Sequence, residues 1–418
     1  MPEQVRSPAV SIAIIGLLFF IFGFVTWLNG PLITFVQLAF ELTVFKAFLV
    51  TFVFYLSYFF FALPASAILD RTGMKKGMGL GLAVMAVGTF AFGEFCVQRW
   101  YPGALGGLFV IGAGLAILQT ASNPYISILG PIESAARRIA LMGICNKIAG
   151  ILAPIVLGAL VLHGMDNLSD QVAAADAAGK AALLDAFAAR IHFPYMVMAA
   201  VLLLLAVGIV LSPLPDVRSE QGEPDAGGDS LFRYPHVWLG ALAIFVYVGA
   251  EVMAGDAIGT YGQGFGLPLD QTRFFTSFTL GAMLVGYVVG FVVIPRYVSQ
   301  QRYLAWSAVL GMLLVLGAYF TKGYVSVGFV AALGFANAMM WPAIFPLGIH
   351  GLGRLIERGS ALLIMGIAGG AIIPQLFAWL KQSHDFQLVF ALLMLPCYLY
   401  ILYFGLRGYR ATPRGTGA

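Results

Sequence analysis

Twelve apolar stretches, each long enough to cross a lipid bilayer, follow one another along the chain and constrain its fold more than any other feature. A membrane-spanning helix needs about 20 predominantly apolar residues. Because backbone groups in lipid must be hydrogen bonded within the segment, such stretches form helices. We therefore predict an all-α membrane protein with spans at 9–38, 46–69, 77–97, 104–126, 138–163, 193–212, 236–262, 272–294, 302–320, 325–349, 359–380 and 386–406.

The composition supports a membrane protein. Of 418 residues, 60% are hydrophobic and 10% are charged, against about 25% charged in an ordinary soluble domain. The first apolar stretch is too long for a signal peptide and lacks a small-residue cleavage site, so we expect it to be retained as a span. Three cysteines lie far apart in apolar runs and predict neither a disulfide framework nor a metal site. These are Cys96, Cys145 and Cys397.

The loop charges predict the orientation. Fifteen of the 23 Lys and Arg residues fall on the side of both termini, seven fall on the other side, and Lys147 lies within a span. The positive-inside rule then places both termini in the cytoplasm. We expect a multi-pass protein of the cell (inner) membrane. On the opposite side, the Ala-rich segment 165–190 is predicted to form a short external helix.

The spans divide into six plus six. Residues 213–235 are polar and rich in Gly and acidic residues, which indicates a flexible cytoplasmic linker between bundles at 1–212 and 236–418. "IAGILAP" (148–154) recurs approximately as "IAGGAIIP" (367–374). Two related six-helix bundles with pseudo-symmetry are typical of transporters that alternate access to a central site.

Ionisable residues inside spans are candidates for function, because each costs about 3 kcal/mol at the bilayer centre. Glu94 is near the end of its span, so we interpret it as a residue at the membrane–water interface. Glu251 and Asp256 share the seventh span, and Gly255 between them predicts a broken helix that lines a cavity. Lys147 is either their charge partner, a substrate donor or a structural lysine. A buried pair that only fixes packing is the alternative for the acids.

Amide side chains recur within five spans and match a ring of sugar hydroxyls, because an amide both donates and accepts hydrogen bonds. The predicted substrate-binding amides are Asn29, Gln119, Asn123, Asn146, Asn337 and Gln375. Trp27 and Trp341, with Tyr125, are expected to cover the apolar face of a pyranose. The alternative for any single amide is a role as a link between helices. A neutral polyol fits this set.

The loop between spans two and three carries "LDRTGMKK" (69–76), which suggests a cytoplasmic gate. Asp70 and Arg71 are the predicted latch between the bundles, and a solvated positive loop is the alternative. The chain has no His-rich metal set, no Gly-rich phosphate loop after a strand and no Ser/His/Asp grouping at one membrane depth. We therefore expect no enzyme and no cofactor.

Several stretches resemble the fucose/galactose/glucose symporter family of the major facilitator superfamily. They are "LFFIFGFVTWLNGPLI" in span one, "GAGLAILQTASNPYISILGP" in span four, "YVGAEV" in span seven and the loop "SAILDRTGMKKG", where Ser66 replaces the usual Gly. The resemblance covers the whole chain and is nearest to the bacterial glucose/galactose and N-acetylglucosamine permeases. It implies a twelve-helix fold and monosaccharide import driven by H⁺ or, in some members, Na⁺.

One departure from the resemblance concerns coupling. L-fucose permease has an aspartate directly after the span-one Asn and a glutamate in the span-four motif, where this chain has Gly30 and Gln119. An offset of 226 residues between the halves matches Gly30 to Asp256. We therefore expect the coupling acid on span seven, with Glu251 or Asp256 taking up H⁺ or Na⁺ and Lys147 as the charge partner.

The sequence thus predicts a cation-coupled symporter that imports a hexose such as glucose, galactose or N-acetylglucosamine. A sugar uniporter or a proton-coupled antiporter on the same fold is the alternative. H⁺ or Na⁺ is the coupling ion, with Na⁺ expected near Glu251 and Asp256 if it is used. The expected partners are the sugar and the lipid bilayer, without nucleic acid, and the protein is expected to act as a monomer.

Overall fold

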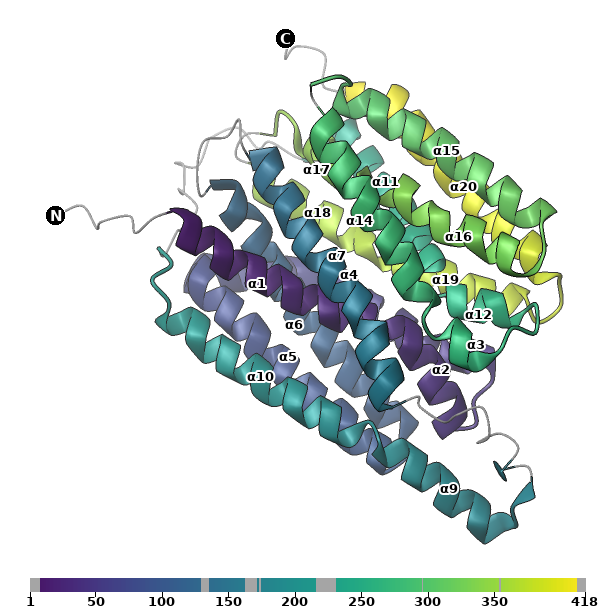
Figure 1. Cartoon of the computed structure of the whole chain (residues 1–418). Coiled ribbons are helices and arrows are strands. Elements are labelled where there is room, and N and C mark those ends of the chain that lie inside the picture. The colour runs from purple at the N-terminus through teal and green to yellow at the C-terminus, as the bar shows by residue number, and fades with distance from the viewer. Residues whose placement is uncertain are drawn as a thin grey trace.

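A computed structural model describes residues 8–128, 135–161, 171–172, 174–215, 231–294, 296–352 and 355–411. Within these ranges the regular structure is helical, and no strand occurs (Figure 1). Twelve helical segments are long and apolar enough to cross a membrane. The number of spans and the all-α membrane fold predicted from the sequence are therefore confirmed, and the ends differ from the prediction by a few residues.

The first half of the chain supplies six spans and one extra helix. Its helices are α1 (Pro8–Trp27), α2 (Asn29–Ala39), α3 (Val44–Ala47), α4 (Leu49–Thr72), α5 (Met74–Val97), α6 (Tyr101–Ile128), α7 (Ala135–Leu160), α9 (Ala177–Ala189) and α10 (His192–Leu211). Helices α1 and α2 form one interrupted span.

The second half supplies the other six spans. Its elements are η2 (Leu231–Arg233), α11 (Pro235–Gly255), α12 (Ile258–Gln263), α13 (Leu269–Thr272), α14 (Phe275–Val293), α15 (Gln300–Phe320), α16 (Gly323–Asn337), α17 (Met340–Ile349), α18 (Ile356–Met365), η4 (Gly366–Ala368), α19 (Gly369–Leu380), α20 (Phe386–Leu406) and η5 (Gly408–Arg410). Breaks separate α11 from α12, α13 from α14 and α16 from α17, and η4 interrupts span eleven.

The halves meet along two pairs of spans. Helix α7 packs along α14, and α4 packs along α18, η4 and α19. The start of α1, the end of α20 and the facing ends of α10 and α11 lie at one end of the molecule, here called the linker end (Figure 1). Helix α9 marks the opposite end, here called the α9 end. The predicted borders 1–212, 213–235 and 236–418 stay predictions, because residues 216–230 lie outside the described part.

Breaks in the spans place polar groups in the interior. Span one is interrupted at Leu28, span seven at 256–257 and span ten at 338–339, and span eleven contains the 3₁₀ turn η4. The predicted break beside Gly255 is confirmed. Pro31 and Pro342 each follow a break by three residues, and proline, which lacks an N–H, cannot continue the helical hydrogen-bond ladder.

Helix α9 confirms the predicted short helix within 165–190, of which 165–170 and 173 lie outside the described residues. Asp176 caps it by accepting from the amide of Gly179 at 2.8 Å. Its buried residues recur at helical spacing against α2, α5 and α10 and are Leu184, Phe187 and Ala188. At the same end Glu94 pairs with His192 at 2.9 Å and is partly exposed, which fits its interfacial assignment.

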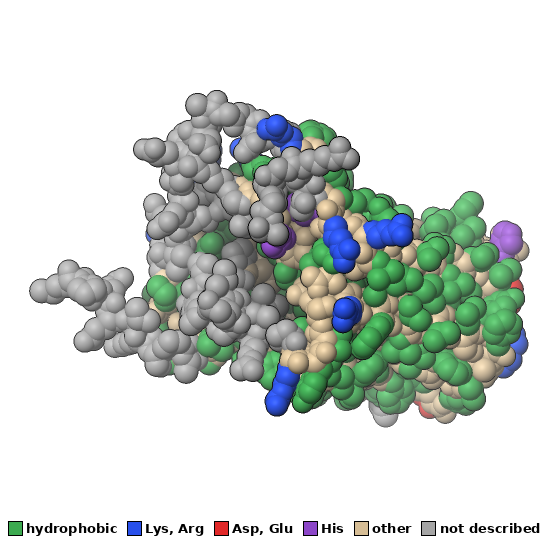
Figure 2. All heavy atoms as spheres, turned by 90° about the horizontal axis from the view of Figure 1, so that it is seen from above, with side chains coloured by type: hydrophobic (Ala, Val, Ile, Leu, Met, Phe, Trp, Pro, Cys, Tyr) green, Lys and Arg blue, Asp and Glu red, His purple; other side chains and the backbone are tan. Residues whose placement is uncertain are grey.

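The outward faces of the helices are apolar. Leu204 on α10 is 71% exposed and Phe278 on α14 is 61% exposed. Figure 2 shows hydrophobic side chains over a broad flank of the molecule, with several Lys and Arg side chains gathered toward one end of it. A surface of this kind would be insoluble in water and fits the acyl-chain region of a bilayer.

Candidate functional site

A buried ion pair joins the two halves at the centre of the molecule. Lys147 Nζ on α7 donates to Glu251 Oε1 on α11 at 2.9 Å. The two side chains are only 6% and 13% exposed. The ammonium group also lies 4.3 Å from the centre of the Trp27 ring, a cation–π contact that further stabilises the charge. The lysine and the glutamate predicted as charge partners are therefore in direct contact.

Four buried tyrosines surround this pair, and the sequence analysis missed them. Tyr247 lies one turn before Glu251 on α11 and its hydroxyl faces the carboxylate. The other three approach the same carboxylate from three further helices and are Tyr55 on α4, Tyr287 on α14 and Tyr398 on α20. A tyrosine hydroxyl within an apolar run was the available signal, because a buried hydroxyl needs a polar partner.

Asp256 occupies the break in span seven. It is 2% exposed. Neither carboxylate oxygen completes a hydrogen bond with good geometry to a described residue, although the backbone of Gly30 faces it from α2. Thus Glu251 has a charge partner, whereas the second acid has none in direct contact. A buried carboxylate of this kind is costly when ionised.

Helix α14 satisfies the backbone that the break exposes. The hydroxyl of Thr276 donates to the carbonyl of Gly255 at 2.8 Å, and that of Thr279 donates to the carbonyl of Ala254 at 2.8 Å. Irregular backbone inside a membrane protein is tolerated where neighbouring side chains supply such partners. The two threonines therefore hold the broken segment in place around Asp256.

Trp27 forms a bridge between three spans. Its indole N–H donates to Asn146 Oδ1 at 3.3 Å, and Asn146 also donates to the carbonyl of Phe19 at 3.5 Å. A Cβ atom added to either Gly150 or Gly255 would lie 2.5 Å from the indole ring. Because Lys147 lies over the ring as well, the indole is enclosed by protein here, and its predicted stacking on a sugar stays a prediction.

Two predicted amides lie at helix breaks with an unused donor. Asn29 begins α2, and its Nδ2 atom is buried without a hydrogen-bond partner among the described residues. Asn337 ends α16; its Oδ1 atom accepts from Tyr398 at 2.8 Å, and its Nδ2 atom has no partner in the same part of the chain. Tyr55 is the side chain that faces Asn29. The amides and the tyrosine cluster are thus connected.

The remaining predicted binding residues are spread over the height of the molecule. Gln119 is half-buried and donates to Tyr58 at 2.9 Å, and Trp341 is half-buried beside the break in span ten and stacks on Phe345. Asn123 is half-buried further along α6. Gln375 lies near the α9 end, where it donates to the carbonyl of Phe45 at 3.0 Å and links the halves.

Tyr125 does not lie with the central group. Its hydroxyl donates to the carbonyl of Pro215 at 2.9 Å, so the ring anchors α6 to the segment that follows α10 at the linker end. The expectation that this ring covers a sugar is not supported by its position. The tyrosine is two residues beyond Asn123, and its hydroxyl faces the linker end.

The predicted gate lies at the end of α4. Arg71 is exposed in the last turn of α4, whereas the side chain of Asp70 lies outside the described residues. Lys75 donates to the carbonyl of Ser212 at 2.6 Å, at the end of α10. A cation at a helix C-terminus is favourable because it complements the helix dipole. The latch formed by Asp70 and Arg71 stays a prediction.

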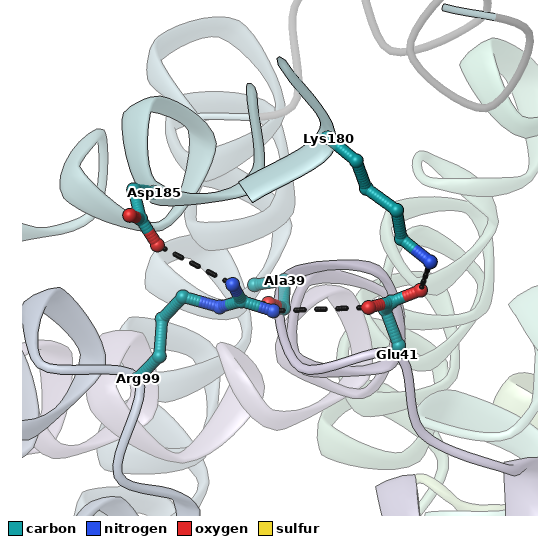
Figure 3. A network of polar contacts seen from close by, with 5 residues as sticks. All are labelled: Ala39, Glu41, Arg99, Lys180 and Asp185. Carbon is teal, nitrogen blue, oxygen red and sulfur yellow. Dashed lines mark hydrogen bonds and ion pairs between the residues drawn. The ribbon is translucent and has the colours of Figure 1, made fainter. Parts of the chain in front are cut away.

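A second polar network covers the α9 end (Figure 3). Arg99 donates to the carbonyl of Ala39 at 3.0 Å and pairs with Asp185 at 3.3 Å and with Glu41 at 4.0 Å. Lys180 binds the other oxygen of Glu41. Two of the four charged residues come from α9. The network therefore ties the end of α2 to α9 and to the loop between α5 and α6.

Among the described residues, no group of three His, Cys, Asp or Glu side chains could hold a metal ion. Cys96 and Cys397 are buried, Cys145 is half-buried, and all three are free. The polar centre is therefore built from one acid–base pair, one unpaired acid, tyrosines and amides. Groups of this kind bind neutral polar molecules and exchange protons.

Known proteins resemble the chain over nearly its whole length. Residues 15–374 match the Major Facilitator Superfamily. The glucose/galactose transporter of Brucella abortus (strain 9-941) is 35% identical over 396 residues, which cover 94% of this chain and 92% of that protein. The L-fucose-proton symporter of Escherichia coli K12 is 30% identical over 393 residues, which cover 91% and 89%.

A solved structure agrees with this relationship. The crystal structure of the major facilitator superfamily transporter FucP in the outward conformation matches with a TM-score of 0.78 and 28% identity, covering 96% of this chain and 99% of that one. The resemblance found in the sequence is thereby confirmed, and the chain is a transporter and not an enzyme. The protein belongs to the major facilitator superfamily.

Proposed function

We propose that the protein is a proton-coupled importer of a hexose, with Asp256 as the group that carries the proton. The observation that supports this most directly is a buried carboxyl group without a hydrogen-bonded or charged partner in contact, at a helix break where the two halves meet. A chain that retains such a group in a membrane gains from it only if its charge state changes during function. The similarity to proteins named glucose/galactose transporter and L-fucose-proton symporter supports the sugar and the proton.

The proposed sugar contacts lie around the Lys147–Glu251 pair. The free amide donors of Asn29 and Asn337 and the half-buried Gln119 offer hydrogen bonds to hydroxyl groups. The Glu251 side chain is 13% exposed, so its carboxylate can accept a hydrogen bond from a sugar hydroxyl. The ammonium group of Lys147 balances the negative charge of that carboxylate meanwhile. The half-buried ring of Trp341 is the proposed apolar platform. Asn123 and Gln375 would bind the sugar at the two ends of its path through the protein. Asn146 would hold Trp27 in place through the hydrogen bond to its indole N–H.

A proton fits the site better than Na⁺. A hard cation needs several oxygen ligands, and carbonyls released at a helix break are the usual source in transporters. Here the carbonyls of Ala254 and Gly255 already accept from threonine hydroxyls. Asp256 alone would leave the ion short of ligands, whereas a proton needs only the carboxyl group.

The transport cycle follows from the cost of burying charge. When the sugar path is open to water, the carboxylate of Asp256 is hydrated. When the two halves close around the site, the ionised carboxylate loses that hydration and becomes unfavourable. Closure is then favoured with the proton and the sugar both bound, so the proton gradient drives the sugar. By the loop charges, we propose that the linker end faces the cytoplasm and that the protein acts as a monomer in the inner membrane.

Uptake into proteoliposomes tests the proposal. Radiolabelled glucose, galactose, N-acetylglucosamine and fucose are supplied separately, with a pH gradient or a sodium gradient imposed alone. We expect one or more of these hexoses to accumulate above equilibrium only with the pH gradient. Accumulation with sodium alone would contradict proton coupling. Equilibration that ignores both gradients would identify a uniporter, and efflux against a proton influx would identify an antiporter.

A further inference from the structure

Asn337 lies at the break in span ten with one end of its amide already used. The residue is fully buried at the end of α16. Its Oδ1 atom accepts from the hydroxyl of Tyr398 on α20 at 2.8 Å. Its Nδ2 atom is buried and has no hydrogen-bond partner among the described residues. Because a buried N–H group without a partner is costly, a molecule that brings an oxygen acceptor to this atom would be stabilised.

The ring of Tyr398 fixes the position of its hydroxyl. The side chain is fully buried, and helix α20 packs along α15. A Cβ atom added to Gly311 on α15 would lie 2.6 Å from the tyrosine ring. The ring therefore occupies the space that a larger residue on α15 would fill, and its hydroxyl stays directed at Asn337.

This hydrogen bond selects one of two orientations of the amide. The terminal torsion of an asparagine has two broad minima, which exchange the positions of its oxygen and its nitrogen. A tyrosine hydroxyl has a single proton to donate, and here that proton goes to Oδ1 of Asn337. A turn of the amide would break this bond and leave the oxygen without its donor. Tyr398 thus keeps Asn337 with its N–H groups directed away from the tyrosine.

The neighbouring polar groups complement this donor. The hydroxyl of Tyr398 also approaches the carboxylate of Glu251 on α11, which accepts hydrogen bonds and donates none when ionised. Gln119 is turned the other way, because its Nε2 atom donates to the hydroxyl of Tyr58 at 2.9 Å and its Oε1 atom is left to accept from a ligand. A sugar hydroxyl both donates and accepts, so it can pair with either kind of group.

We propose that Tyr398 is a positioning residue for sugar specificity, which holds Asn337 so that its amide donates a hydrogen bond to an oxygen of the bound hexose and accepts none. The inference rests on the proposed function as a hexose importer and adds which end of the amide meets the sugar. It makes a chemical distinction at one position of the sugar. A fluorine atom accepts a hydrogen bond weakly and cannot donate, so fluorine should replace that oxygen better than hydrogen does.

Equilibrium binding measures this distinction. Radiolabelled glucose, galactose, N-acetylglucosamine and fucose are each tested for binding to the purified protein in nanodiscs, at one pH and without an ion gradient. The sugar that binds is then displaced by its deoxy and deoxyfluoro forms, modified at one carbon at a time. In the wild-type protein we expect one carbon at which the fluoro form binds about threefold to tenfold more tightly than the deoxy form, the range that one hydrogen bond contributes.

Two substitutions on α20 separate the orientation of the amide from the loss of a hydroxyl. Tyr398→Phe frees the amide to turn, so the preference for the fluoro form at that carbon should disappear. Tyr400→Phe is the matched control, because its hydroxyl donates to the carbonyl of Leu239 and not to an amide. The control should keep the wild-type preference.

A double variant tests whether the tyrosine acts through the amide. Asn337→Ala should lose the preference for the fluoro form, since the donor itself is gone. Tyr398→Phe combined with Asn337→Ala should bind every analogue as Asn337→Ala alone does, because residues that act as one unit are not additive. A further loss in the double variant, equal to that of Tyr398→Phe alone, would show that the tyrosine acts by another route.

A second route to the same answer keeps the hydroxyl. Gly311→Ala places a methyl group 2.6 Å from the Tyr398 ring and should displace it, so the preference for the fluoro form should weaken. Gly328→Ala, where a Cβ atom meets nothing within 4 Å, should keep it. This pair decides the question if Tyr398→Phe is not monodisperse.

The outcomes distinguish this inference from the proposed function. A fluoro preference that survives in Tyr398→Phe, or its absence at every carbon in the wild-type protein, would overturn the positioning role and leave the hexose importer standing. A protein that binds none of the four sugars would contradict both. Because no gradient is used, the expected pattern in a protein that does not accumulate sugar with a pH gradient would contradict the proposed function alone.

Discussion

Lys147 on α7 and Glu251 on α11 form a direct ion pair of 2.9 Å between the two halves of the protein. Both are almost fully removed from solvent. Breaking such a pair by removing one partner leaves an uncompensated buried charge, which is more destabilising than removing both. The pair therefore constrains any movement of the halves, since neither charge can be left alone in an apolar interior.

Removing the lysine alone should destabilise the protein more than removing both charges. Because Glu251 would be left ionised and unpaired, Lys147→Met is expected to cost about 3–5 kcal/mol, and Lys147→Met with Glu251→Gln should recover most of this loss. Thermal unfolding of the purified protein in detergent, followed by tryptophan fluorescence, gives the comparison. Equal melting temperatures for the single and double variants would show that the pair contributes no coupling.

The enclosure of Trp27 predicts a steric effect at Gly255. A methyl group there would lie 2.5 Å from the indole ring, and overpacking of this kind costs about 1–3 kcal/mol. Gly255→Ala should therefore lower the melting temperature. Gly328→Ala on α16 is the control, because a Cβ atom there meets nothing within 4 Å. An equal loss in both variants would point to a general intolerance of glycine replacement and not to the indole.

The network at the α9 end predicts unequal contributions from its cations. Lys180 only pairs with Glu41, which is 46% exposed, and exposed pairs contribute about 0–1 kcal/mol. Arg99 is 25% exposed and also binds the carbonyl of Ala39 at the end of α2, so Arg99→Ala should destabilise more than Lys180→Ala. The melting temperatures of the two variants, measured at low and at high salt, test this prediction. A larger, salt-sensitive loss for the lysine variant would be inconsistent with these contacts.

Much of the fold was predictable because hydrophobic length alone defines a span. The number of spans and the break at Gly255 followed from apolar runs and a glycine beside two acids. The interruption of span eleven by η4 was not predicted, because the glycines of that stretch fitted an unbroken helix equally well. Helix ends were less certain, as at α5, which begins at Met74 and not at the predicted residue 77, because polar residues such as Lys75 and Lys76 can extend a helix beyond the apolar core.

The candidate site was only partly predictable. A charge inside a span is visible in the sequence, so Lys147, Glu251 and Asp256 were found. The buried tyrosines were missed because a tyrosine in an apolar run is equally compatible with a lipid-facing or interfacial position. Which acid has a partner depends on contacts between α7 and α11, over a hundred residues apart, and no local pattern encodes that distance.

The most direct test of proton transfer by Asp256 is the pH change that sugar causes in a weakly buffered suspension of sealed vesicles. Adding a transported hexose to vesicles with the wild-type protein should make the medium more alkaline, because each sugar enters with a proton. Asp256→Asn should abolish this signal and accumulation while sugar exchange at equal concentrations continues, since the neutral amide mimics the protonated acid. Sugar-induced alkalinisation that persists in Asp256→Asn would contradict the account.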